Sequence, residues 1–133
     1  MATQTHLPLH WRLRLLDVLD CPRSDENLRF LQAWAQAEGV TGSSLSQRNP
    51  LNTTYPLPWG SSDFNDSHVK NYSTPLEGIA ATALTLDQAT FAPIVNSLKA
   101  GTATAEQIVT SCWEQIRTWG TNPQVILDVL KTM

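Results

Sequence analysis

Apolar residues recur every three or four positions along most of the chain, except between Val40 and Tyr72, where no such period exists. This spacing lines apolar side chains along one face of an α-helix. The pattern predicts helices over residues 8–20, 24–38, 75–87, 91–99, 104–119 and 122–130. Start signals precede four of these segments, because Ser24, Thr74, Thr104 and Asn122 can each accept a hydrogen bond from the first helical turn.

The aperiodic middle is rich in Gly, Pro, Asn and Ser, which favour turns, and only residues 52–55 and 68–72 have β-forming character. We therefore expect a small β-hairpin or sheet inside a long functional loop. With the predicted helices, this gives an α+β fold, mainly helical with a small β-hairpin. A length of 133 residues predicts a single domain over residues 1–133.

Charge and composition exclude several classes of partner. Charged residues make up 16% of the chain and the formal net charge is −3, so we expect no nucleic-acid binding. Apolar runs are far shorter than a bilayer needs, so we expect no membrane insertion. The first residues lack the basic and apolar regions of a secretion signal, which predicts synthesis in the cytoplasm without a signal peptide.

No metal or cofactor is expected from the motifs. Cys21 and Cys112 are too few and too far apart for a zinc site, and we expect both to be buried free thiols. A calcium-loop pattern that starts at Asp63 has His68 where Gly is required. The sequence contains no phosphate-binding loop, no GxGxxG dinucleotide-binding motif and no GxSxG serine-hydrolase motif.

Glu38 has an unusual position for a carboxylate. It ends an apolar helix, meets the negative end of the helix dipole, and is followed by Gly39, which lets the chain turn away. Trp34 lies one turn earlier and would supply an apolar wall, so both effects favour the protonated acid. Such an acid suits general-acid cleavage of a glycosidic bond, although an exposed glutamate at a helix end is the alternative.

Three segments in a fixed order resemble the lysozyme-like fold of phage and bacterial peptidoglycan hydrolases: AWAQAEG at 33–39, NPLNTT at 49–54 and VKNYSTPLEGI at 69–79. The resemblance is closest to the glucosaminidase and lytic transglycosylase branch, and it covers about 28–121. In that branch a helix ends in the catalytic Glu, an Asn-rich segment follows, and a β-hairpin ends in a Tyr. The later Trp-Gly-Thr run at 119–121 also resembles the end of phage proteins of this type.

The resemblance implies cleavage of the peptidoglycan glycan strand, with Glu38 as the general acid. Asn49 and Asn52 would line the sugar groove or, alternatively, cap turns through their own backbones. Tyr72 would contact the sugar or, alternatively, pack as a structural residue between the hairpin and the third predicted helix. Two departures from the branch put activity in question: Gly39 replaces a frequent Ser, and Thr53 replaces an expected Gly.

Further site residues follow from the chain itself. Asp63 and Asp66 are the nearby candidates for the second carboxylate that a hydrolase needs; without one, an internal sugar attack would give an anhydro product. Trp59 lies in a Pro-flanked loop, where we expect it to stack on a sugar ring. The alternative function is a non-catalytic phage virion or tail module that binds cell wall or other particle proteins. In either case the protein would act at the cell wall or be carried in a phage particle.

Overall fold

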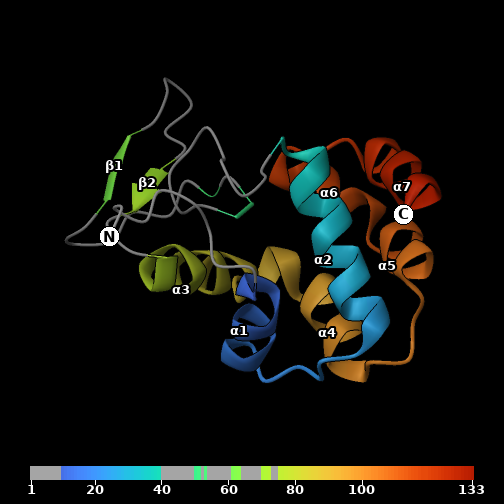
Figure 1. The fold of residues 1–133 in the computed structure, drawn as a ribbon, viewed down its shortest axis with the longest axis horizontal. Coiled ribbons are helices and arrows are strands. Elements are labelled where there is room, and N and C mark those ends of the chain that lie inside the picture. The colour runs from blue at the N-terminus through green and yellow to red at the C-terminus, as the bar shows by residue number, and fades with distance from the viewer. Residues whose placement is uncertain (1–9, 40–49, 52, 54–60, 64–69, 73–74) are drawn as a thin grey trace.

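Helices form the body of the molecule (Figure 1). The computed structural model describes residues 10–39, 50, 51, 53, 61–63, 70–72 and 75–133. The helices before the strands are α1 (Trp11–Val18) and α2 (Asp25–Ala37). Those after the strands are α3 (Pro75–Leu86), the 3-10 turn η1 (Ala89–Phe91), α4 (Ala92–Ala100), α5 (Ala105–Ser111), α6 (Trp113–Trp119) and α7 (Pro123–Thr132).

The second helix, α2, is the central element, with α1, α5 and α7 packed against it (Figure 1). Its apolar residues recur at helical spacing and face the interior, as the sequence pattern predicts. The side chains that α2 contributes to the core are Phe30, Leu31, Ala33, Trp34 and Ala35. A helix covered on several sides in this way is a rigid support for whatever stands at its end.

Three of the predicted helix starts are confirmed. The Ser24 hydroxyl accepts a hydrogen bond from the Asn27 backbone N–H at 3.1 Å. Thr104 and Gln107 form a reciprocal capping box, and Asn122 caps α7. Thr74, the fourth expected cap, lies outside the described residues.

The expected α+β class is wrong, because helices supply nearly all of the described core. Among the described residues, β structure amounts to two three-residue strands, β1 (Ser61–Asp63) and β2 (Lys70–Tyr72), which pair antiparallel. A two-stranded ladder this short does not make a separate sheet layer of the fold. The class is therefore all-helical, and turn-rich composition over 40–72 is a poor guide to sheet content.

The predicted helix over 104–119 is interrupted. Cys112 leaves the helical region, with φ −109° and ψ 23°, and separates α5 from α6. Apolar spacing runs through this point because Ile108, Cys112 and Ile116 all face the core. Periodicity alone therefore could not reveal the break.

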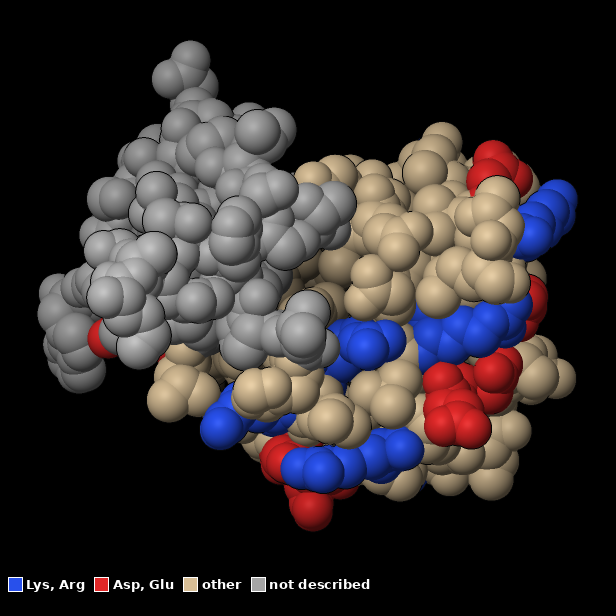
Figure 2. Space-filling model, viewed as in Figure 1, with Lys and Arg blue, Asp and Glu red and all other residues tan. Residues whose placement is uncertain are grey.

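Both cysteines are buried free thiols, which confirms that expectation. Burial raises the pKa of the Cys21 thiol above its ordinary value. On the described part of the face in Figure 2, basic and acidic side chains lie interspersed. Among the described helices, none is long and apolar enough to cross a membrane.

Candidate functional site

Glu38 stands at the C-terminal end of α2, as the sequence predicts. It is the C-cap residue, with φ −78° and ψ −1°, and its backbone N–H still donates to the Trp34 carbonyl at 3.0 Å. Gly39 follows with φ +73°, a left-handed conformation that ends the helix and that glycine adopts without strain. The side chain of Glu38 is half-buried, so its carboxyl lies at the edge of the core.

A hydrogen-bonded chain connects this carboxyl to the core. The indole Nε1–H of Trp34 donates to the Thr121 hydroxyl oxygen at 2.8 Å. The Thr121 hydroxyl in turn donates to Oε1 of Glu38. Trp34 is fully buried and Thr121 is 5% exposed, so solvent competes little for the first of these bonds.

The turn between α6 and α7 brings Thr121 to Glu38. Gly120 ends α6 with φ +111°, and the Thr121 backbone N–H then donates to the Ile116 carbonyl at 3.2 Å. Asn122 follows at once as the cap of α7. Two helix ends therefore fix the backbone on both sides of Thr121, close to the end of α2 (Figure 1).

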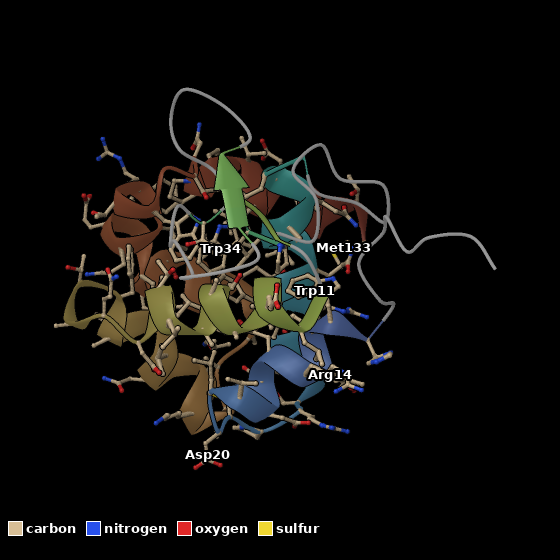
Figure 3. The ribbon with its side chains drawn as sticks, turned by 90° about the vertical axis from the view of Figure 1, so that its left-hand side faces the viewer. Trp11, Arg14, Asp20, Trp34 and Met133 are labelled. Atoms are coloured by element: carbon tan, nitrogen blue, oxygen red, sulfur yellow. The ribbon has the colours of Figure 1, made fainter. Side chains whose placement is uncertain are left out.

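A row of aromatic rings packs around the Trp34 indole that binds Thr121. The ring centroids of Phe30 and Trp34 lie 5.5 Å apart, those of Trp34 and Trp119 lie 5.2 Å apart, and those of Trp119 and Phe91 lie 5.1 Å apart. The last two pairs meet edge to face, a favourable arrangement for aromatic rings. Figure 3 shows Trp34 in the interior, whereas Arg14 and Asp20 lie at the periphery. The indole that binds Thr121 thus packs against two aromatic neighbours.

Part of the Asn-rich segment is anchored to the same cluster. Leu51 is fully buried, and its carbonyl accepts a hydrogen bond from the Trp119 indole at 2.8 Å. Thr53 is also buried, and its hydroxyl lies 2.6 Å from that of Thr85 on α3. Leu51 therefore contacts the aromatic cluster that also contains Trp34, the residue one turn before Glu38. The hydroxyl of Thr53 has a structural use that the expected Gly would lack.

Two of the other predicted site residues, Asp63 and Tyr72, lie in the two short strands. Asp63 ends β1, where its Cα pairs with that of Lys70, and Tyr72 ends β2 opposite Ser61. Only the backbone of these strands is described. Four further candidates lie outside the described residues: Asn49, Asn52, Trp59 and Asp66. Most of residues 49–72, which would form the predicted cleft with Glu38, also lie outside the described residues.

A shallow hollow of about 360 Å³ lies beside Thr121. Its lining consists of Trp113, Arg117, Gly120, Thr121, Asn122 and Pro123. Arg117 in this hollow also forms an exposed ion pair with Glu114, at 3.5 Å. Thr121 is therefore shared between the hollow and the bond to Glu38.

Metal binding has no support in the described side chains, since they include no group of three or more His, Cys, Asp and Glu residues that could hold an ion. What the arrangement offers chemically is a carboxyl group held by a buried hydroxyl. Such a group can exchange a proton with a ligand from a defined position.

The sequence analysis missed the contribution of Thr121. Its hydroxyl reaches a carboxyl 83 positions away, and no local pattern encodes such a contact. A weak signal was present in the Gly120-Thr121-Asn122 run, because a helix-ending Gly next to a helix cap fixes the intervening residue. Trp34 was expected in the core beside Glu38, and it lies there.

Comparison of the chain with models of known protein families, with curated proteins and with solved structures finds no match.

Proposed function

We propose that the protein cleaves the glycan strand of peptidoglycan, with Glu38 as the general acid. The observation that carries the proposal is the held carboxyl at the end of α2: Glu38 caps a buried helix and binds the Thr121 hydroxyl. General-acid catalysis needs a carboxyl at a fixed position beside the scissile bond. The order of the Glu38, 49–54 and 69–79 segments supports peptidoglycan as the substrate.

In this reaction the Glu38 carboxyl gives its proton to the oxygen of the bond between two amino sugars. The bond from the anomeric carbon to that oxygen breaks, and the leaving sugar departs as an alcohol. Glu38 remains as a carboxylate, which can take a proton from the incoming hydroxyl group. Proton and charge are then restored for the next cycle.

The nucleophile distinguishes two forms of the proposal. Water would give hydrolysis, with Asp63 or Asp66 as the second carboxylate that directs the water or stabilises the cation. A hydroxyl of the same sugar would give an anhydro product, with Glu38 acting alone. In both forms, Asn49, Asn52, Trp59 and Tyr72 are the proposed sugar contacts.

The test uses the whole protein on purified, insoluble peptidoglycan. We expect soluble glycan fragments, whose mass identifies hydrolysis by an added water or transglycosylation by an anhydro end. Protein that sediments with the wall but releases nothing would contradict the enzymatic proposal and favour the non-catalytic wall-binding or virion module. Protein that neither binds nor releases fragments would contradict both.

A further inference from the structure

The direction of the hydrogen bonds between Trp34, Thr121 and Glu38 can be assigned from their chemistry. An indole N–H only donates, so the Thr121 oxygen is the acceptor of the bond at 2.8 Å. A hydroxyl has a single proton, and that of Thr121 is directed at Oε1 of Glu38. The chain therefore runs in one direction, from the indole through the hydroxyl to the carboxyl.

This direction distinguishes the two oxygens of Glu38. Oε1 accepts a proton from Thr121 and faces the buried side of the carboxyl group, because Thr121 is 5% exposed and Trp34 is fully buried. We infer that Thr121 is a positioning residue, which holds the Glu38 carboxyl through Oε1 so that the carboxyl meets a ligand from a fixed position.

Surrounding groups keep Thr121 in this role. Gly120 ends α6 and Asn122 caps α7, so the backbone beside the hydroxyl is fixed on both sides. Trp34 cannot swing away, because Phe30 and Trp119 pack on it with centroid distances of 5.5 and 5.2 Å. The hydrogen-bonded relay from Trp34 through Thr121 to Glu38 is thus formed before any ligand binds. Catalytic preorganisation requires groups that are fixed in this way.

The catalytic consequence of this inference rests on the proposed function, but the relay itself can be tested without turnover. The indole proton of Trp34 should sense the ionisation of Glu38 through the Thr121 hydroxyl. We would follow its nuclear magnetic resonance signal, assigned by through-space contact with the residue 121 methyl group, between about pH 3 and pH 7, where carboxyl groups titrate.

Three variants give the contrast. In the wild-type chain, the Trp34 signal should move with pH, and in Glu38→Gln it should stay constant. Thr121→Ser keeps the hydroxyl, so the Trp34 signal should still shift with pH; it is assigned by transfer from the wild-type spectrum. Thr121→Val keeps the shape of the side chain but lacks the hydroxyl, so the pH-dependent shift should be lost. A wild-type signal that does not move, or a Thr121→Val signal that moves like wild type, would overturn the relay. If Thr121→Val does not fold, Thr121→Ala, which also lacks the hydroxyl, supplies the same contrast with Thr121→Ser.

Turnover on peptidoglycan supplies the second readout. Thr121→Val should lower kcat roughly 10- to 100-fold with little change in KM, because the acid is misplaced while the sugar contacts remain. Thr121→Ser should recover most of kcat. Unchanged kcat in folded Thr121→Val would overturn the positioning role. If the wild-type protein releases no fragments, the proposed function fails, and the resonance experiment alone decides whether the relay exists.

Discussion

Single buried polar groups determine much of this structure, because each one needs a hydrogen-bond partner in place of water. Thr121 receives one bond from Trp34 and gives one to Glu38. Asn27 on α2 plays a comparable structural role at the other end of that helix. Its side-chain amide donates to the Pro22 carbonyl at 2.9 Å and to the Leu98 carbonyl at 2.8 Å.

Replacing Asn27 by Ala should lower the free energy of unfolding by about 2 to 4 kcal/mol, because the Leu98 carbonyl loses a buried donor and the Pro22 carbonyl a partly buried one. Chemical denaturation measures this loss. Gln36→Ala, at an exposed position of the same helix, is the control and should change stability by less than about 0.5 kcal/mol. Equal losses in the two variants would show that the buried amide is not an important contact.

At the scale of elements, Arg29 connects α2 to its neighbours α5 and α7. Its guanidinium binds both carboxylate oxygens of Glu106 at 2.8 and 2.9 Å, and donates to the Leu130 carbonyl at 3.2 Å. Hydrogen bonds from Arg29 are the main reason why the pKa of Glu106 lies below its ordinary value of 4.5. The pair is partly exposed, so its contribution to stability is small.

The stability that this pair supplies should depend on pH. A carboxyl with a lowered pKa in the folded state stabilises the fold above its unfolded pKa, and this contribution is lost as pH falls through the folded pKa. Thermal unfolding of wild type and Glu106→Gln should therefore differ most above about pH 5 and converge in stronger acid. Glu114→Gln, in a more exposed pair, is the control. A wild-type advantage that grows on acidification would contradict this assignment.

The capping box of α5 gives a second prediction for an element. The Thr104 hydroxyl accepts from the Gln107 backbone at 3.1 Å, and the Gln107 side chain accepts from the Thr104 backbone at 2.8 Å. Thr104→Ala removes the hydroxyl and should cost about 1 to 2 kcal/mol of unfolding free energy. Thr118→Ala, at an exposed position inside α6, removes a hydroxyl without a cap and should cost much less. Similar costs at both positions in chemical denaturation would exclude a capping role.

At the scale of the whole molecule, the sequence predicts what local chemistry determines. The face of α2, the caps at Ser24 and Thr104, and the end of α2 at Gly39 all follow from nearby residues. The all-helical class did not follow, because the β-forming residues at 52–55 and 68–72 were interpreted as a small hairpin or sheet.

The candidate site shows the same limit. Glu38 was found from its place at the end of an apolar helix, which is a local property. Thr121 was missed because its contact joins the end of α2 to the turn between α6 and α7, and only packing of the whole molecule brings them together. The residue that holds the Glu38 carboxyl is thus harder to predict from the sequence than Glu38 itself.

The most direct test of the central claim is the rate at which Glu38→Gln releases soluble fragments from purified peptidoglycan. The amide keeps the shape of the side chain and loses the transferable proton, so we expect the rate to fall by at least about 100-fold. Glu114→Gln, an exposed glutamate changed in the same way, should retain the wild-type rate, and all three proteins should unfold at similar temperatures. Undiminished release by a folded Glu38→Gln protein would contradict the account.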